Sequence, residues 1–243
     1  MRLVTWNAGR GPFNRKAPWL DHLQCDVAVI QEIGCPPQQD AQVQWFGVNP
    51  RQGVAVLARA PYRLTPMPQM VDAPAFFVPF AVTGPQVFQL YAVWTLGSQP
   101  CPYVEAANQC IDMYLPNESP LAVPVVAMGD FNSNAVWDGK RPNRRNHTAM
   151  VERLARRGLV SAFHADRGVA HGAEASPTFW HRSNKRGFHI DYCFLPAAWV
   201  RRIRHVDIGT HAAWKLASDH VPLLVDLADP IGDPRQIDRT DRA

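Results

Sequence analysis

A carboxylate and a carboxamide lie two residues apart in the stretch Gly129-Asp130-Phe131-Asn132. The stretch directly follows an apolar, β-branched run at 123–127, which predicts a buried strand. At the end of such a strand, Asp130 and Asn132 can project together into a site, and Gly129 permits close backbone approach or an unusual φ. Taken alone, the motif is short and is also consistent with a turn that closes a core strand. The rest of the sequence must decide between the two interpretations.

Polar side chains accompany the ends of several other predicted strands. In chain order, the full set is Asn7, Glu32, Asp130 with Asn132, Asp191, and Asp219 with His220. Carboxylate and amide oxygens are hard ligands of the type that hold Mg²⁺ or Mn²⁺. A histidine beside an aspartate can supply a base or orient a water near neutral pH. Together these groups predict metal-assisted attack on a phosphate ester.

The elements that must position these groups are mostly strands. Apolar or alternating runs predict strands at 2–7, 26–30, 53–58, 75–82, 86–94, 123–127, 188–195 and 221–225. Helical spacing predicts helices over 19–23, 104–115 and 151–155, with Gly158 as the C-terminal cap of the last. Strands outnumber helices, and most are apolar enough to be covered on a face. This pattern favours an α+β architecture of two packed mixed sheets with outer helices over a doubly wound parallel sheet.

Size and composition fit one domain. The chain has 243 residues, of which 47% are hydrophobic, so a substantial core is expected and a disordered chain is not. Prolines are spread along the chain without marking a boundary. We therefore expect a single domain over 1–228 and a polar, frayed tail over 229–243. The net charge of +4 is compatible with anionic ligands but is too small to establish nucleic-acid binding.

The cysteines and the apolar runs bear on the compartment. Five cysteines without C-x-x-C spacing indicate reduced thiols and no disulfide framework or zinc site. The sequence begins without a secretory signal pattern, and no apolar run approaches the roughly 20 residues that cross a bilayer. A soluble, cytoplasmic and monomeric protein is the resulting expectation.

Five motifs in order resemble the endonuclease/exonuclease/phosphatase superfamily, which has the DNase I-like fold. The motifs are Thr5-Trp6-Asn7, Gln31-Glu32, Gly129-Asp130-Phe131-Asn132, His189-Ile190-Asp191-Tyr192 and Ser218-Asp219-His220. Each is weak alone, but the series spans nearly the whole chain in family order. The resemblance implies a four-layered α/β sandwich, dependence on a divalent metal, and hydrolysis of phosphodiesters or phosphomonoesters.

The resemblance also implies the ligands of the metal. Glu32 corresponds to the principal metal carboxylate, with Asn7 and Asp219 near the same cation. Structural alternatives exist for each position. Asn7 is a residue type that tolerates left-handed turns, Glu32 could end a strand at the surface, and Asp219 could belong to a helix cap or turn.

Four further residues would carry the chemistry by the same resemblance. Asp130 would orient or deprotonate the attacking water, and Asn132 would hold the phosphate or that water. His220 would contact the scissile phosphate, with Asp191 fixing its tautomer and supporting its positive charge. The alternatives are that Asn132 forms a turn and that Asp191 pairs structurally with His189 or an arginine.

One departure from the family concerns the strand that ends near Trp94. The family commonly carries a further histidine at this strand end, whereas this chain has Trp94, Thr95 and Leu96, none of which is an imidazole. Activity could rest on Asp130 and His220 alone, with a lower rate or another substrate. It could also be lost, which would leave a non-catalytic phosphate-binding descendant of the fold.

Two loops combine cations with aromatic rings. The first, 137–147, leaves the strand of Asp130 and supplies Trp137, Arg141 and Arg145 as candidate substrate-binding residues. The second, 179–186, precedes His189, the fourth candidate. Such loops suit a phosphate backbone with stacked bases, although sugar phosphates or plain solvated loops fit as well. Four other histidines, His164, His171, His205 and His211, lack metal-ligand spacing and are expected to be ordinary surface or core residues.

The sequence thus leads to one hypothesis and two alternatives. The hypothesis is a Mg²⁺- or Mn²⁺-dependent phosphodiesterase of nuclease type, with DNA or RNA as possible substrates. The enzymatic alternative is a phosphatase acting on a small phosphorylated metabolite or a lipid headgroup. The third possibility is a phosphate-binding protein without turnover.

Overall fold

Two six-stranded β-sheets pack face to face in the computed structural model, which describes residues 1–74, 76–97, 103–115, 121–183 and 185–229. The first sheet contains, in spatial order, β13 (Ile203–Ile208), β14 (Leu223–Leu227), β1 (Arg2–Asn7), β2 (Val27–Ile33), β4 (Gln52–Ala58) and β3 (Val43–Asn49). The second contains β5 (Arg63–Pro66), β6 (Phe77–Thr83), β7 (Phe88–Trp94), β8 (Val125–Asp130), β12 (Asp191–Pro196) and β9 (Leu159–Ser161). Both sheets are mixed, because β1 pairs in parallel with β2 and β7 with β8, while the remaining pairs are antiparallel.

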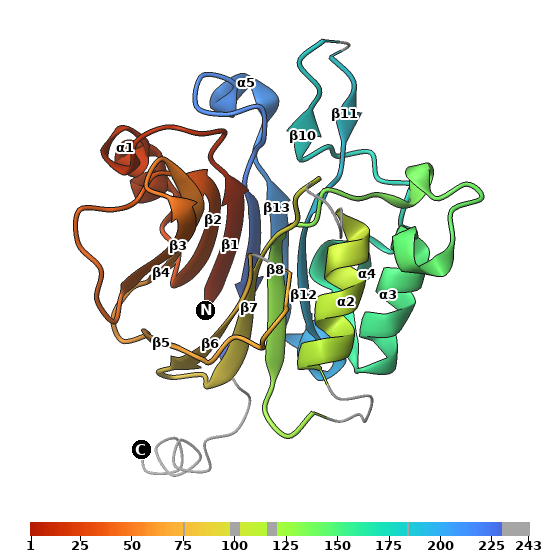
Figure 1. Ribbon diagram of the computed structural model, residues 1–243, viewed down its shortest axis with the longest axis horizontal. Helices are drawn as coiled ribbons and strands as arrows, with labels where there is room; N and C mark the ends of the chain where they lie inside the picture. Colours follow the sequence, from red (N-terminus) through yellow and green to blue (C-terminus); the bar gives the residue numbers. More distant parts are fainter. Residues whose placement is uncertain (75, 98–102, 116–120, 184, 230–243) are drawn as a thin grey trace, which may run out of the picture.

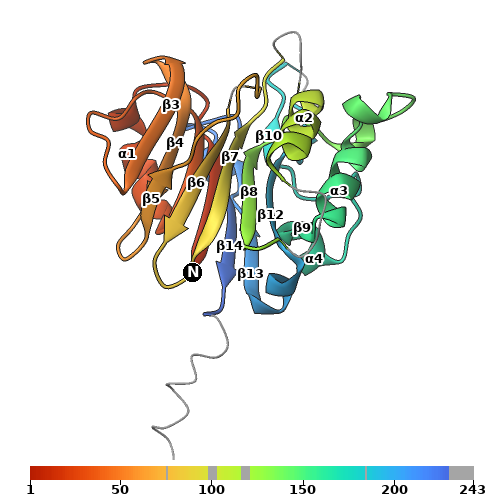
Figure 2. The ribbon, with the colours of Figure 1, turned by 60° about the horizontal axis from the view of Figure 1, so that its bottom comes forward.

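Helices cover the outer faces of both sheets (Figure 1). The helix α1 (Phe13–Leu23) lies outside the first sheet, and Figure 2 shows the others beside β8 and β12 of the second. These are α2 (Val104–Tyr114), α3 (His147–Arg156) and α4 (Ala162–Arg167). The order of layers is therefore helix, sheet, sheet, helix, which confirms the four-layered α/β sandwich expected from the sequence.

Smaller elements complete the fold. They are the ribbon β10 (Phe179–Trp180) with β11 (Gly187–Phe188), the helix α5 (His211–Trp214), and the 3₁₀ turns η1 (Ala135–Trp137), η2 (Asn143–Arg145) and η3 (Ala197–Arg202). The ribbon and α5 project from one edge of the sandwich (Figure 1). Within the described residues, no helix has the length and apolar composition needed to cross a bilayer.

The alternation of strand side chains builds three apolar layers. In β1, Leu3 faces the core between the sheets, whereas Val4 and Trp6 face α1, because successive side chains point to opposite sides of a strand. The face towards α1 meets Leu20 and Leu23 of that helix. The second sheet is covered in the same way by residues of α2 and α3. Each sheet is thus buried on both faces, and only its edges are available for polar chemistry.

Most predicted elements are present, and the main correction concerns 188–195. This run is not one strand: residues 187–188 belong to β11, and a new strand, β12, begins at Asp191. The break arises because the Thr178 hydroxyl accepts hydrogen bonds from the backbone N–H groups of Ile190 and Asp191. The tail predicted from 229 onwards lies, apart from Asp229, outside the described residues.

Gly129 is required by the parallel pairing of β7 and β8. In this register Val93 lies opposite Gly129 and Trp94 opposite Asp130. A Cβ atom on Gly129, whose φ is +153°, would lie 1.8 Å from the carbonyl oxygen of Val93. No side chain fits at this distance, so glycine brings β8 close enough to β7 to set the position of Asp130.

We expect Gly129→Ala to lower the free energy of unfolding by more than about 2 kcal/mol, because the two strands must separate to admit the methyl group. Urea unfolding followed by tryptophan fluorescence measures this. The matched control is Gly139→Ala, where φ is also positive but no heavy atom lies within 4 Å of the added Cβ. Equal losses in the two variants would contradict the role given to the close approach.

Candidate active site

The predicted site residues converge at one edge of the sandwich. Asn7 ends β1 and Asp130 ends β8, each in a different sheet. Asp191 begins β12, which runs antiparallel to β8, so that Asp191 lies directly opposite Asp130 in the register. His220 joins them from the segment before β14 through an isolated bridge to Phe179. Strand ends from both sheets therefore meet around a common point.

At this point two carboxylates and one imidazole form a buried group. Nδ1 of His220 lies 2.9 Å from Oδ2 of Asp191 and makes a hydrogen bond with it. Nε2 of His220 lies 4.0 Å from Oδ2 of Asp130, too far for a direct hydrogen bond. All three side chains are at least nine-tenths buried. We call Asp130, Asp191 and His220 the central cluster.

Burial and mutual charge set the protonation of the central cluster. Burial lowers the pKa of His220, but the charge and hydrogen bond of Asp191, together with Asp130, outweigh it and raise the pKa to about 9. Burial and the negative charge of Asp191 raise the pKa of Asp130 to about 7, against the opposing effect of His220. Near neutral pH the imidazole is therefore protonated, and Asp130 can gain or lose a proton.

Three hydrogen bonds orient the Asp130 carboxylate. Its Oδ1 accepts from the backbone N–H of Asn132 at 2.8 Å. Its Oδ2 accepts from the side-chain amides of Asn132 at 3.0 Å and Asn7 at 2.9 Å. Asn132 adopts φ +46°, the left-handed conformation that asparagine tolerates, and this turn brings its amide back over Asp130. Asn132 is thus both a turn former and a direct partner of Asp130.

Glu32 lies next to the central cluster through Asn7. The Asn7 amide that contacts Asp130 also lies 3.2 Å from Oε1 of Glu32. The β2–β4 pairing shifts register between Ile30 and Ile33, and Glu32 takes φ +55° there, which turns the residue out of the regular ladder. Arg10 and Gln52 contact its other oxygen at 3.3 and 3.1 Å. The carboxylate is therefore held in a fixed place and remains partly exposed.

Asp219 lies on the other side of the Asn7–Arg10 turn. A Cβ on Gly9 would lie 3.3 Å from Oδ1 of Asp219, and Oδ2 pairs with Arg182 at 2.8 Å. The contacts of Asp219 are thus with Gly9 and Arg182, whereas Glu32 contacts Asn7 and Arg10. The two carboxylates predicted to share one cation therefore both lie beside the segment Asn7–Arg10.

The donor chemistry of this edge fits a hard divalent cation. Glu32 and Asp130 supply carboxylate oxygens within reach of one amide, and this is the ligand type that Mg²⁺ and Mn²⁺ prefer. Oδ1 of Asp191 is buried and has no hydrogen-bond partner within the described part of the chain. Asp130, Asp191 and His220 also bring one potential ligand atom each within 4.8 Å of one another. The carboxylate oxygens at this edge are therefore of the type that a divalent cation binds.

The end of β7 carries Thr95 where the family commonly has a histidine. The Thr95 hydroxyl donates to the carbonyl oxygen of Phe131 at 2.6 Å, and its backbone oxygen accepts from the Asn132 amide at 2.9 Å. Its backbone N–H donates to the Asp130 carbonyl at 3.0 Å. Thr95 therefore holds the Asp130–Asn132 loop, and Trp94 packs into the core against Phe76.

Three of the four predicted substrate-binding residues line one cavity. Trp137, Arg141 and Arg145 surround a cavity of about 240 Å³ that Asn132 also lines. Arg145 is paired with Glu105 at 2.6 Å, and the Trp137 ring packs against Phe188. His189 is not part of this surface. It is 2% exposed and its Nδ1 contacts the Ser176 carbonyl, so the prediction that His189 binds substrate is wrong.

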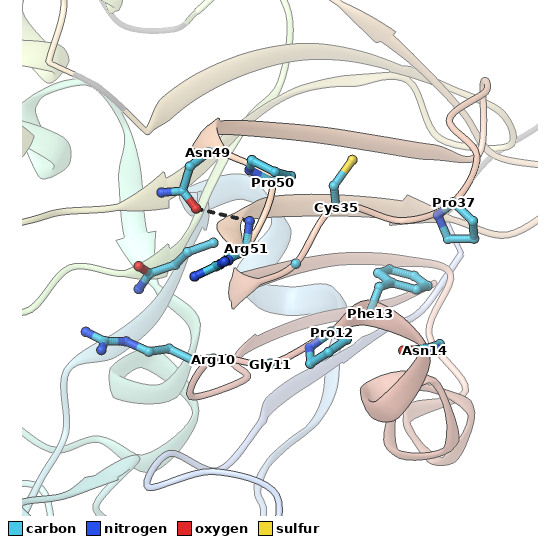
Figure 3. A pocket seen from close by; sticks show the side chains of 12 residues that line it. Arg10, Gly11, Pro12, Phe13, Asn14, Cys35, Pro37, Asn49, Pro50 and Arg51 are labelled. Carbon is cyan, nitrogen blue, oxygen red and sulfur yellow. Dashed lines mark hydrogen bonds between the residues drawn. The ribbon is translucent and has the colours of Figure 1, made fainter.

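A larger cavity, of about 1050 Å³, adjoins Glu32 and was not foreseen (Figure 3). Arg10 and Phe13 line one side, and Arg51 and Gln52 line the other from the turn between β3 and β4. The turn is fixed by a hydrogen bond from the Arg51 backbone N–H to the Asn49 side chain at 3.0 Å. No local motif marks these residues, because the cavity forms only when the loops after β1 and β3 meet.

Lys16 was also missed by sequence analysis. It is 9% exposed, and its Nζ donates to the carbonyl oxygens of Ala8 and Ala217. These carbonyls belong to the loops that carry Asn7 and Asp219, so Lys16 ties the two loops together. A single lysine on an amphipathic helix resembles a surface residue in the sequence and gave no signal of this role.

The expectation that His164 and His171 are ordinary residues is wrong in one respect. Each brings a ring nitrogen close to a carboxylate oxygen of Glu174, and the three potential ligand atoms lie within 4.8 Å of one another. His205 and His211 are exposed, as expected. Residues 164, 171 and 174 come from a helix and an irregular segment, which is why their spacing suggested no site.

Two packed sheets with outer helices, and a charged edge where strand ends converge, define the DNase I-like class of α/β sandwiches. A sequence profile of the Endonuclease/Exonuclease/phosphatase family matches residues 4–220, and the chain belongs to this family. Membership of this family supports a phosphoesterase of nuclease or phosphatase type. A comparison with curated proteins finds no match.

Solved structures similar to this chain include enzymes that act on DNA. One is a 3′ phosphatase from Neisseria bound to a product DNA hairpin, with 17% identity, coverage of 94% of this chain and 99% of that chain, and a TM-score of 0.60. An AP endonuclease from Archaeoglobus fulgidus has 16% identity, coverage of 93% and 99%, and a TM-score of 0.62. An AP endonuclease from Leishmania major has 15% identity, coverage of 94% and 88%, and a TM-score of 0.66. At these identities the likeness establishes the fold.

We expect Asp191→Asn to lower the pKa of His220 in the metal-free protein from about 9 towards or below its ordinary 6.5. The substitution removes the charge that stabilises the imidazolium, while the burial that opposes it remains. An NMR pH titration of the His220 ring proton measures the change. Asp207→Asn, at an exposed position of β13, is the control, and an unchanged pKa of His220 in Asp191→Asn would contradict the assignment.

Proposed function

We propose that the chain is a Mg²⁺- or Mn²⁺-dependent phosphodiesterase of nuclease type. The observation that carries this proposal is the central cluster, held next to Glu32 by the single amide of Asn7. It combines a protonated imidazole, a carboxylate poised near neutral pH and an oxygen-donor site for a cation. Attack of water on a phosphate ester needs these three components in contact.

Asp130 is the group that takes a proton from the attacking water. A general base works best when its pKa is near the working pH, and burial together with Asp191 raises the pKa of Asp130 to about 7. Its three hydrogen bonds, from Asn132 and Asn7, fix the direction of its lone pairs. Asn132 also lines the arginine-containing cavity, where its amide can meet a phosphate oxygen.

His220 provides positive charge to the phosphate. Asp191 occupies Nδ1, so the Nε2–H is the free donor of the imidazolium. At 4.0 Å from Asp130, this proton is not consumed by the neighbouring carboxylate and can be donated to a phosphate or leaving-group oxygen. Asp191 therefore positions His220 and holds it in the charged form.

A divalent cation at Glu32, Asn7 and Asp219 supplies neutralisation of the phosphoryl charge when bound. The contribution of the chain is the orientation of Glu32 by Asn7, Arg10 and Gln52. Arg10 and Gln52 also line the larger cavity, so two partners of the Glu32 carboxylate lie in its wall.

Two separate cavities with arginines support a phosphodiester as the substrate. The smaller cavity has Arg141 and Arg145 beside Asn132, and the larger one has Arg10 and Arg51 beside Glu32. Cationic side chains at both sites suit a strand that continues with phosphates beyond each side of the scissile bond. A phosphomonoester would require one such site.

A phosphatase is the second candidate, and the size of the smaller cavity favours it. At about 240 Å³, with two arginines and the Asn132 amide, it would accommodate a terminal phosphate group. A non-catalytic phosphate-binding protein is the remaining alternative, since Thr95 replaces the imidazole common at the end of β7 in the family.

We expect the purified chain to cleave a phosphate ester with Mg²⁺ or Mn²⁺ and not with a chelator. The panel contains single- and double-stranded DNA, RNA, bis-p-nitrophenyl phosphate and p-nitrophenyl phosphate. Asp130→Ala and Glu32→Ala should lower the rate by at least about 100-fold, because each removes a group that acts at the transition state. Preference for the diester supports a nuclease, and preference for the monoester supports the phosphatase. Binding of phosphate esters without turnover under either metal would contradict both enzymatic candidates.

We expect Arg141→Ala to weaken DNA binding and to reduce the slope of log affinity against log salt by about 1, because one phosphate contact is lost. Fluorescence anisotropy with a labelled oligonucleotide in the presence of Ca²⁺ measures the affinity. Arg204→Ala, an exposed arginine on the edge strand β13, is the control. Equal salt slopes for Arg141→Ala and the unmodified chain would remove this loop from the substrate path.

A further inference from the structure

A second group of titratable side chains lies apart from the central cluster. We call it the histidine cluster: His147 begins α3, His164 lies in α4, and His171 and Glu174 lie in the segment 168–178 between α4 and β10. His147 and His164 are buried, the Glu174 side chain is 3% exposed, and His171 is half-buried. His147 also lines the smaller cavity beside Asn132, and none of the four residues belongs to the central cluster.

The donor atoms of the histidine cluster converge. Nε2 of His147 lies 3.0 Å from Nδ1 of His171, and Nε2 of His164 lies 2.9 Å from Oε1 of Glu174. Potential ligand atoms of His164, His171 and Glu174 all lie within 4.8 Å of one another. Donors of a tetrahedral zinc ion, at bonds of about 2.0–2.1 Å, are about 3.3 Å apart. The cluster therefore has nearly the ligand spacing of such a site.

The atoms that face away from this convergence point are already hydrogen-bonded. Nδ1 of His147 contacts the Ser133 hydroxyl at 2.8 Å, and Nδ1 of His164 contacts the Ser161 hydroxyl at 2.8 Å. Glu174 accepts from the Gly172 backbone and from the Asn134 amide. Metal-binding histidines and carboxylates typically have such outer partners, which fix the ring and its tautomer.

Two imidazoles and the carboxylate are in the protonation state that metal binding needs, while the Nε2 proton that His164 donates to Glu174 is released when an ion binds. Burial, with the neighbouring histidines, lowers the pKa of His147 to about 4 and that of His171 to about 2. Burial raises the pKa of Glu174, but hydrogen bonds from His164 and Gly172 outweigh it and lower the pKa to about 2. Neutral imidazoles and one carboxylate thus meet in a largely dry environment at neutral pH.

An independent observation comes from His189, which lies beside the cluster. Its ring centroid is 5.6 Å from that of His164, and its Nδ1 contacts the Ser176 carbonyl at 2.9 Å. A carbonyl oxygen can only accept a hydrogen bond, so Nδ1 of His189 must carry a proton. Burial lowers the pKa of His189, so the ring is neutral and Nε2 has a free lone pair. This Nε2 is buried without any hydrogen-bond partner in the described part of the chain. A buried lone pair without a donor is costly unless something electron-poor lies nearby.

We propose that the histidine cluster binds one Zn²⁺-like cation, separate from the oxygen-donor site at Glu32. Several imidazoles with one carboxylate suit zinc and its neighbours in the first transition series, whereas Mg²⁺ prefers oxygen ligands. The ion fixes the irregular segment 168–178 to α3 and α4. Through Ser133 and Asn134, which directly follow Asn132, it also supports the loop that carries Asp130.

The test uses the full chain, freed of metal by a chelator and then titrated with Zn²⁺ by calorimetry and with Co²⁺ by visible absorption. We expect one equivalent of either ion to bind, Co²⁺ to show ligand-field bands of mixed imidazole and carboxylate coordination, and the Tm to rise on binding. Absence of stoichiometric Zn²⁺ binding would overturn the proposal and leave a hydrogen-bonded histidine network.

Variants separate ligands from supporting residues. His171→Ala, at the half-buried position, should weaken Zn²⁺ binding by more than about 100-fold, and Ser133→Ala by about 10- to 100-fold, as expected for the loss of an outer partner. Should His171→Ala fail to fold, Glu174→Gln, which retains the shape of the side chain, takes its place. Wild-type Zn²⁺ affinity in the folded ligand variant would overturn the proposal.

Two controls exclude binding elsewhere. His205→Ala and His211→Ala remove exposed imidazoles outside the cluster and should leave the Zn²⁺ affinity unchanged. Glu32→Gln alters the oxygen-donor site and should also retain the Zn²⁺ equivalent, so failure of this proposal and failure of the phosphoesterase proposal are distinguishable. Loss of the equivalent in Glu32→Gln alone would place the bound ion at the edge of the sandwich and overturn the assignment.

Discussion

The ion pair between Asp191 and His220 is the interaction on which the site depends. Neither residue is more than 5% exposed, and a buried charge is tolerated only when it is paired and hydrogen-bonded. Asp191 begins a strand of the second sheet, while His220 precedes a strand of the first. The bond therefore crosses from one sheet to the other. The same contact that fixes the relative position of the sheets also keeps the imidazole charged next to Asp130.

Polar side chains bonded to backbone groups position this pair. The Thr178 hydroxyl accepts hydrogen bonds from the backbone N–H groups of Ile190 and Asp191, and this separates β11 from β12. The Ser218 hydroxyl donates to the Asn7 carbonyl and accepts from the His220 N–H, so it joins the loop after β1 to the segment before β14. Lys16 connects the same two segments through hydrogen bonds from its Nζ to the carbonyl oxygens of Ala8 and Ala217. The side chains of Thr178, Ser218 and Lys16 thus bind backbone groups of the scaffold.

The sequence was sufficient for the central strands and for the central cluster, because buried strands are apolar runs and their polar ends stand out against them. It did not predict β13, because this edge strand pairs along one side only and its exposed residues, such as Arg204 and His205, interrupt the apolar pattern of a strand. It also placed His189 on the substrate-binding surface, whereas the side chain is buried, because a shift of one residue in a broken strand reverses the direction of a side chain. The large cavity and the histidine cluster depend on contacts between distant loops, which leave no periodic or motif signal.

Thr95 shows how the site compensates for the missing imidazole. Through its hydroxyl, its N–H and its carbonyl, it binds the backbone of Phe131 and Asp130 and the amide of Asn132. The end of β7 thus contributes rigidity to the Asp130 loop and no charge. In the proposed mechanism, positive charge towards a phosphate then comes from His220, from the arginines of the two cavities and from a cation at Glu32. Because the other end of the same loop, Ser133 and Asn134, is bonded to His147 and Glu174, the loop is anchored on both sides of Asn132. The family commonly has a second histidine at this strand end. In this chain the same position instead helps to hold Asp130 in a fixed place next to His220.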